Sequence, residues 1–397
     1  MGRTVDPLGH LGDRETTGCG TVIVMRLSGV GLTGFVVGLL FGQQPTAIHH
    51  PFLWDRELSL RPNLYIPEAA VVDAGGVLWV LCSARMGNEG YDKQHVTQAI
   101  FRIDEQGNQL STAELGLPLS QEERGDTSDY RITPLRDGGI GLAFNKIRFE
   151  TRGQSYLGAF YSTLGTDGKA GPLRQVAGPE IEVSAFVGLA NGDLLLGGGL
   201  GDLLTFDPNG VSRWKKSFVQ PILENSDAAV LSDRNICISA WAATRQRLLN
   251  KIRVMRLGQQ GDVLHTADID ALRGQVAAGP DGSCAVLYDR APSIYKGEYY
   301  LTLFDRSFNR QWTVPVPHSS ASGAEFDLIS RAEGSLAQIG NVIVQYDWSG
   351  KEVWKDIEHL GQTRTIVAAG TDGFFIVTKD LGMNNGFHVK RAAATKE

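Results

Sequence analysis

The sequence lacks the marks of several large protein classes. Charged residues make up 21% of its 397 residues, and a net charge of -6 provides no global basic field for nucleic acid. Apart from one N-terminal segment, no long stretch shows the apolar period of an amphipathic helix. The 4 cysteines form no C-x-x-C pair and no zinc-type spacing. A helical domain, a nucleic-acid-binding protein and a structural zinc protein are therefore disfavoured.

Short motifs of common enzyme classes are also missing. There is no P-loop, no G-x-S-x-G nucleophile elbow, no calcium loop of the D-x-[DN]-x-[DN]-G type and no sialidase-type Asp box. The Gly-rich stretch 197–201 lacks a following helix and predicts a tight hairpin rather than a phosphate cradle. We therefore expect no metal ion, and no motif identifies a catalytic residue.

Three of the cysteines, Cys82, Cys237 and Cys284, lie in apolar runs typical of strands. The simplest interpretation is that they are buried, small apolar side chains. Disulfide bonding is the alternative that stays open, although a chain of this size does not require it.

The one helix-like segment lies near the N-terminus. Residues 25–47 have a short positive end, an uncharged apolar core and a polar end, which is the layout of a secretory signal peptide. Residues 1–24 would then be a start-site artefact, and the protein would be secreted or periplasmic. The alternatives are an uncleaved membrane anchor at residues 25–42, which would be the only membrane contact, and a buried helix.

Glycine, by contrast, is abundant at 48 residues, and much of it occurs in repeated turns. An Asp, a Gly three residues later and a Trp four residues after that recur along the chain. The clear copies are Asp347/Gly350/Trp354 and Asp207/Gly210/Trp214, with a variant copy at Asp305/Phe308/Trp312 and weaker ones at 104–111, 164–172 and 258–265. A second motif, two apolar runs joined by a tight turn, precedes each copy and occurs seven times, beginning near residues 71, 134, 188, 230, 277, 328 and 367.

Each repeat thus predicts four antiparallel strands, and stacked four-stranded repeats predict an all-β fold, a seven-bladed β-propeller over residues 48–397. Six blades are the alternative if one weak unit merges with its neighbour. The last repeat lacks a fourth strand, which residues 54–62 can supply, so that the N-terminal strand closes the ring. We expect Trp214, Trp312 and Trp354 to be structural and to pack on the neighbouring blade, a contact that contributes about 2–3 kcal/mol each.

The Asp-Gly-Trp copies resemble the repeats of pyrroloquinoline-quinone-like propellers, and the segments 73–80 and 100–108 look like NHL-type and lyase-type secreted propellers. The resemblance implies a propeller fold. It also raises the quinone and Ca²⁺ that some members hold, but the adjacent cysteines common near that cofactor are absent here. We therefore expect no cofactor.

Four long connections between the second and third strands of their repeats suggest where a ligand would bind. These are residues 83–98, 145–158, 241–251 and 288–298, and they emerge on one face of the propeller. Their basic and aromatic side chains predict a site for an anionic small molecule, glycan or protein partner. The candidate ligand-binding residues are Arg85, Tyr91, Asp92, His95, Arg148, Glu150, Arg152, Arg245, Arg247, Asp289 and Arg290.

The leading functional hypothesis is a binding or assembly scaffold. The alternative is a propeller hydrolase or lyase with an acid/base pair on the same face, drawn from Asp92, His95, Glu150 and Asp289. A carboxylate or His with a strongly shifted pKa in the central channel would favour the enzyme.

Overall fold

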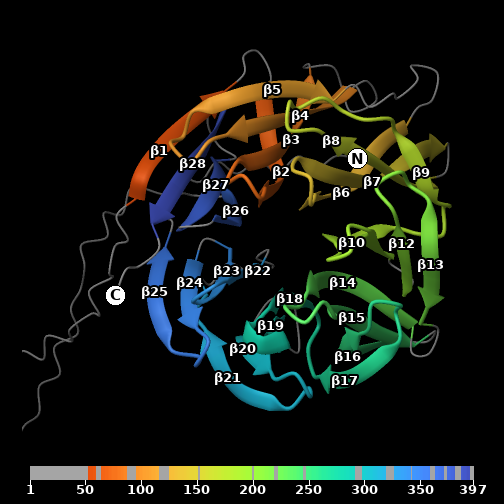
Figure 1. Ribbon diagram of the computed structural model, residues 1–397, viewed down its shortest axis with the longest axis vertical. Helices are drawn as coiled ribbons and strands as arrows, with labels where there is room; N and C mark the ends of the chain where they lie inside the picture. The colour runs from red at the N-terminus through yellow and green to blue at the C-terminus, as the bar shows by residue number, and fades with distance from the viewer. Residues whose placement is uncertain are drawn as a thin grey trace, which may run out of the picture. The chain divides into compact units, whose positions relative to one another are not determined.

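In the computed structural model, the described part of the chain forms seven four-stranded antiparallel sheets (Figure 1). It also contains a short 3₁₀ helix, η2 (Pro280–Gly282). The structure describes residues 52–59, 64–86, 95–115, 125–150, 153–198, 201–218, 222–244, 247–290, 297–318, 326–340, 342–357, 363–370, 373–380 and 386–393. The targeting segment predicted at residues 1–47 lies outside these ranges.

Each sheet is one blade, and six of the seven are built from strands consecutive in the chain. Blade 1 consists of β2 (Leu64–Val72), β3 (Leu78–Met86), β4 (His95–Ile103) and β5 (Gln109–Leu115). Blade 2 consists of β6 (Gly125–Pro134), β7 (Ile140–Glu150), β8 (Gly153–Leu164) and β9 (Arg174–Ala177). Blade 3 consists of β10 (Val183–Gly188), β11 (Leu194–Gly198), β12 (Asp202–Phe206) and β13 (Ser212–Ser217). Blades 4 and 5 are β14 (Ile222–Val230), β15 (Ile236–Thr244), β16 (Arg247–Leu257), β17 (Val263–Ile269); and β18 (Gly274–Ala278), β19 (Cys284–Asp289), β20 (Tyr299–Phe304), β21 (Arg310–Val316). Blade 6 is β22 (Phe326–Arg331), β23 (Gly334–Ile339), β24 (Val342–Asp347), β25 (Glu352–Ile357), and blade 7 is β26 (Thr363–Gly370), β27 (Gly373–Asp380), β28 (Gly386–Ala393) and β1 (Phe52–Ser59).

The blades form a closed ring. The first strand of each blade contacts the first strand of the next, in the cycle β2, β6, β10, β14, β18, β22, β26 and back to β2. These seven strands surround the axis, and the fourth strands lie at the rim (Figure 1). The predicted seven-bladed β-propeller is therefore confirmed, and the six-bladed alternative is excluded.

The N-terminal strand closes the ring, as predicted. β1 pairs antiparallel with β28 from Phe52↔Ala392 to Ser59↔Gly386 and supplies the missing outer strand of blade 7 (Figure 1). The pairing covers the edge of β28, which would otherwise expose a row of backbone hydrogen-bonding groups.

The Asp-x-x-Gly motif forms the turn between the third and fourth strands. In blade 6, Asp347 Oδ1 accepts hydrogen bonds from the backbone N–H groups of Ser349 and Lys351, at 2.9 and 3.0 Å. Gly350 has a φ of +86°, which an L side chain rarely adopts. The spacing of three residues therefore follows from one carboxylate capping a turn that needs a positive φ near its end.

The Trp at the end of the motif lies against the turn of the next blade. Trp214 Nε1 donates to the carbonyl oxygen of Gln259, and Trp312 Nε1 donates to that of Trp348. In blade 7, β1 supplies Trp54, whose Nε1 donates to the carbonyl oxygen of Glu105 in blade 1. All three acceptors occupy the second position of their turn, so the closing strand repeats the contact made within the ring.

Apolar side chains between the blades form the core. The described residues contain seven clusters of buried apolar residues, one for each pair of adjacent blades. The cluster between blades 6 and 7 has six buried members, the fewest of the seven, and includes Trp354, whose ring is 5.2 Å from that of Phe374. Stability therefore comes from a ring of separate interfaces rather than from one central core.

A disulfide bond joins blades 4 and 5. Cys237 in β15 and Cys284 in β19 are bonded and fully buried. Both residues are buried, as expected, and they form the disulfide bond that the sequence had left open as an alternative; Cys82 is also buried as expected. The second strands of adjacent blades face each other across the interface, and this non-local relationship brings together two cysteines 47 residues apart.

Candidate functional site

The antiparallel blades give the ring two distinct faces. Turns from the first to the second strand and from the third to the fourth strand emerge on one side, which we call the short-turn face. Connections from the second to the third strand, and from one blade to the next, emerge on the other, which we call the long-connection face. The anionic site predicted from the sequence belongs to the long-connection face.

A cavity of about 450 Å³ lies on the short-turn face, where the inner strands of four blades end. This volume is within the range of about 300–1,000 Å³ typical of small-molecule sites. Blades 4, 5, 6 and 7 line it with Val230, Ser232, Ala278, Gly279, Pro280, Ser330, Arg331, Ala332, Glu333, Trp348, Ala369 and Gly370. Many of the lining residues are small, so their side chains leave the cavity open. A few polar groups among them can orient a ligand.

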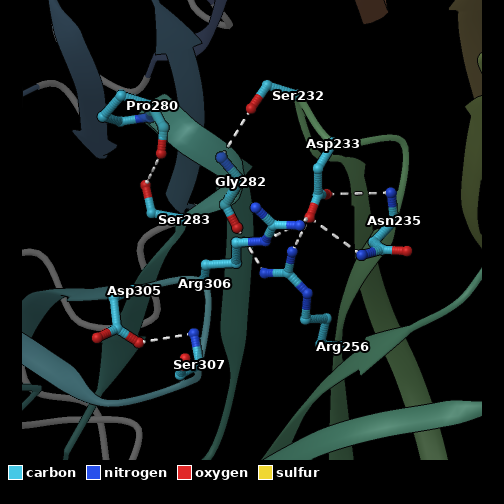
Figure 2. A network of polar contacts seen from close by, with 10 residues as sticks. All are labelled: Ser232, Asp233, Asn235, Arg256, Pro280, Gly282, Ser283, Asp305, Arg306 and Ser307. Carbon is cyan, nitrogen blue, oxygen red and sulfur yellow. Dashed lines mark hydrogen bonds and ion pairs between the residues drawn. The ribbon is translucent and has the colours of Figure 1, made fainter.

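A network of charged and polar groups holds one wall of this cavity (Figure 2). The Asp233 carboxylate lies between two guanidinium groups, that of Arg256 and, with Nε 3.6 Å from Oδ2, that of Arg306. Arg256, only 2% exposed, also donates to the carbonyl oxygen of Gly282 in blade 5. The Gly282 N–H in turn donates to Ser232 Oγ at 2.7 Å. The network thus ties the first turn of blade 4 to the first turn of blade 5 at the edge of the cavity.

Blade 6 contributes the most polar part of the lining. Arg331, the last residue of β22, forms an ion pair with Glu333, and its guanidinium lies 5.4 Å from the ring centroid of Phe374 in blade 7. Burial is the main cause that lowers the pKa of Arg331, and the Glu333 carboxylate opposes this shift. Trp348 Nε1 donates to the carbonyl oxygen of Ala332 at 3.0 Å, so an indole also borders the cavity.

Deeper along the axis, polar side chains of the inner strands bridge neighbouring blades. Asp227 in β14 accepts a hydrogen bond from the Val276 N–H at 2.8 Å. Burial raises the pKa of Asp227 to about 7, helped by the negative charge of Asp327 and opposed by the Val276 hydrogen bond and by Arg131. Arg131 itself donates to the carbonyl oxygen of Ser184 in the next blade. The channel therefore contains a carboxylate that titrates near neutral pH.

The residues predicted on the long-connection face are only partly described. Tyr91, Asp92, Arg152 and Arg245 lie outside the described residues. The backbones of Arg85, His95, Glu150 and Arg247 lie at strand ends in β3, β4, β7 and β16. Arg148 in β7 is exposed, and so is Arg290, whose guanidinium lies 5.9 Å from the ring centroid of Tyr300. Binding of an anionic partner by this set of residues stays a prediction.

Asp289, the remaining candidate, is buried in β19. Its Oδ1 accepts from the backbone N–H groups of Leu272 and Arg273 at 3.0 and 2.8 Å, and its Oδ2 pairs with Arg273 Nε at 3.2 Å. These contacts hold the chain where it enters blade 5. Asp289 thus has a structural environment that accounts for its burial.

The long connections themselves differ from the expectation of extended loops. β7 and β8 continue to Glu150 and Gly153, and β15 and β16 continue to Thr244 and Arg247, so much of 145–158 and 241–251 is paired strand. The reason is that polar and apolar residues alternate there, as in Lys146, Ile147 and Arg148, which suits a hairpin with one covered face.

Sequence reasoning missed Arg331 and Asp227. Arg331 stands at the start of the first turn of blade 6, where blades 2, 3 and 4 have Leu135, Leu189 and Leu231. A cation at a position that is Leu in three other blades was the available signal, although blade 1 also has a charged residue there, Asp73. Asp227 gave none, because the seven inner strands that surround the channel are distant from one another in sequence.

Among the described residues, no group of three or more His, Cys, Asp and Glu side chains is placed to hold a metal ion. In the same part of the chain, no helix has the length and apolarity to cross a membrane.

The fold and site define a seven-bladed β-propeller with an axial cavity on its short-turn face. No protein-family model matches the chain, and no curated protein matches it by sequence. Its structure is similar to that of a catalytically inactive variant of virginiamycin B lyase from Staphylococcus aureus with quinupristin, with a TM-score of 0.57 and 12% identity over 85% of this chain and 99% of that one.

A streptogramin B lyase is similar with a TM-score of 0.53 and 11% identity, covering 85% of this chain and 97% of that one. The WD40 domain of Pan2 from Neurospora crassa follows with a TM-score of 0.51 and 12% identity, covering 84% and 91%. At these identities the likeness shows the propeller fold and is consistent with the resemblance noted in the repeats.

Proposed function

We propose that the protein is a binding scaffold that holds a small polar ligand, or a short segment of a partner, in the axial cavity of the short-turn face. The observation that carries the proposal is the cavity itself, which four blades line at the axis. Two of these blades, 4 and 5, are tied to each other at its edge by the Asp233–Arg256–Gly282 network (Figure 2). A rigid scaffold with a preformed cavity binds without first ordering its own chain.

The proposed location is a secreted or periplasmic compartment. The buried Cys237–Cys284 bond supports it, because such bonds persist in oxidising compartments and are rare in reducing ones. The signal-like segment at residues 25–47 is the second support.

The binding proposal is tested by filling the cavity. Ala332 is exposed and lines the cavity, so Ala332→Phe should block it without disturbing the core. Ala190→Phe is the matched control, because Ala190 is an exposed residue of the corresponding turn in blade 3 and does not line the axial cavity. A library of small polar fragments, screened by ligand-observed NMR, should give hits that Ala332→Phe removes and Ala190→Phe keeps. Hits unaffected by Ala332→Phe, or no hits at all, would contradict the proposal.

One observation favours a second candidate, a lyase or hydrolase. Asp227 is a channel carboxylate with a pKa of about 7, suited to moving protons at neutral pH. Incubation with quinupristin, the molecule present in the Staphylococcus aureus lyase structure, followed by chromatography, separates the two candidates. The binding proposal predicts no consumption of quinupristin. Consumption that Asp227→Asn abolishes would establish the enzyme.

A further inference from the structure

Arg331 has an unusual environment within the cavity lining. Its side chain is 3% exposed, and its guanidinium lies over the ring of Phe374. It sits between blades 6 and 7, where the apolar cluster of the described residues is smallest. An arginine is almost never buried to this extent unless its donors are paired.

The hydrogen bonds of Arg331 are incomplete. Nη2 pairs with the Glu333 carboxylate, but Nη1 is out of contact with solvent and has no acceptor among the described residues. Gln345 Oε1 and Thr378 Oγ1, on the strands β24 and β27 that face each other across the same interface, are also buried without a partner in the described part of the chain. A buried charged donor without an acceptor costs more than a neutral one, so the site is poised to gain an acceptor.

Glu333 is the residue that pairs with the Arg331 guanidinium in this structure. It lies in the two-residue turn between β22 and β23, and its side chain is 41% exposed. The Glu333 carboxylate therefore reaches solvent, and it can turn into water once another anion pairs with the buried guanidinium in its place. An incoming oxyanion that replaced it would meet a guanidinium with two donors side by side.

Other groups in the lining can bind the same ligand. Ser232 Oγ accepts from Gly282, so its own hydrogen can be donated. The indole of Trp348 offers an apolar surface at the cavity, next to the Ala332 carbonyl to which it is bonded. The lining thus offers a ligand the buried guanidinium of Arg331, the hydroxyl group of Ser232 and the indole ring of Trp348.

We propose that the axial cavity binds an oxyanion, a phosphate or carboxylate group, that engages Arg331 by displacing Glu333. This inference rests on the proposed binding function and names the chemical class of its ligand. Glu333 then pairs with the Arg331 guanidinium in the unliganded protein and competes with the oxyanion for it.

The test uses the full chain, with inorganic phosphate and acetate as separate probes at constant ionic strength. The indole ¹⁵N–¹H signal of Trp348, assigned by its loss in Trp348→Phe, reports on the cavity. A saturable shift of this signal is expected with the oxyanion that the site accepts, and the two arms show whether phosphate or carboxylate is preferred. Arg331→Gln should weaken binding about tenfold or more, with Arg331→Lys in between.

Because Arg331→Gln removes a buried group, the deciding variant is Glu333→Gln, which alters a partly exposed side chain. It should bind the oxyanion about fivefold more tightly, since the competing carboxylate is gone. Asp268→Asn is the matched control, because Asp268 lies on the outer strand β17, pairs with Arg253 and is 43% exposed. That variant should leave the affinity unchanged.

Affinity that is equal in the parent protein and in Glu333→Gln would overturn the inference, and so would the absence of a saturable shift with both probes. Neutral fragments that bind and are lost in Ala332→Phe, together with no response to either anion, would retain the binding function and reject the oxyanion. Failure of both neutral and anionic probes would reject the proposed function as well.

Discussion

The imidazole of His265 stacks on the ring of Phe308, with centroids 6.1 Å apart and an angle of 18° between the planes. His265 occupies the Trp position of blade 4, and Phe308 occupies the Gly position of the turn in blade 5. Elsewhere the same place holds a large ring over a glycine, as in Trp312 against Gly350. At this contact the ring from the outer strand is smaller and the residue that it covers is larger than in the Trp–Gly contacts of the other blades.

This difference predicts coupled substitutions. His265→Trp alone should crowd Phe308, and Phe308→Gly alone should leave a void. The double variant should restore the arrangement of the other blades and be about 1 kcal/mol more stable than the sum of the single effects. Urea unfolding of the four proteins measures this coupling. Strictly additive effects would show that the side chain favoured at one of the two positions does not depend on the size of the side chain at the other.

Gly350 tests the contribution of the Trp contact. Its φ is +86°, and an added Cβ would lie 2.9 Å from Trp312 Cδ2. Gly192 is the control, because its φ is +90° and an added Cβ would meet nothing within 4 Å. Both Gly→Ala changes carry the cost of a positive φ. Gly350→Ala should lower the free energy of unfolding by about 1–2 kcal/mol more than Gly192→Ala. Equal losses would mean that the indole moves aside freely.

Asp227 predicts a pH dependence of stability. Its folded pKa of about 7 lies above its ordinary value of 3.8, so the folded protein binds the proton more tightly than the unfolded chain. The stability that this proton confers is therefore present at low pH and is lost as the pH rises from about 4 to 7. Asp227→Asn mimics the protonated form.

Asp227→Asn should be about 2–4 kcal/mol more stable than the parent protein at pH 8, with the difference shrinking towards pH 4. Thermal unfolding between pH 4 and 9 measures it. A stabilisation that is the same at every pH would rule out titration of this carboxylate as the cause.

The Cys237–Cys284 bond closes a loop across two blades, with a sequence separation of 47. Replacing both cysteines by Ala should lower the free energy of unfolding by about 4 kcal/mol, since the unfolded chain is no longer constrained. Reduction under denaturing conditions, followed by refolding in the presence of reductant, should give a similar loss. Peptide mapping without reductant should recover the cross-linked peptide, and its absence would contradict the assignment.

The sequence predicted features set by local chemistry. The Asp347 carboxylate caps a turn only a few residues long, so its role and that of Gly350 could be read from spacing alone. The closing strand could be predicted because the count of strands left one missing, and residues 54–62 overlap β1 (Phe52–Ser59). Relationships between blades could not be read in this way. The disulfide, the pairing of Asp233 with Arg256 and the burial of Arg331 against Phe374 depend on how strands from different repeats face each other.

The central claim is that Arg331 receives an oxyanion in the axial cavity. A crystal structure of the protein grown at saturating phosphate tests it most directly. The account predicts a tetrahedral anion within hydrogen-bonding distance of the Arg331 guanidinium, with Glu333 rotated away. An Arg331–Glu333 pair left intact, beside a cavity that holds only water, would contradict it.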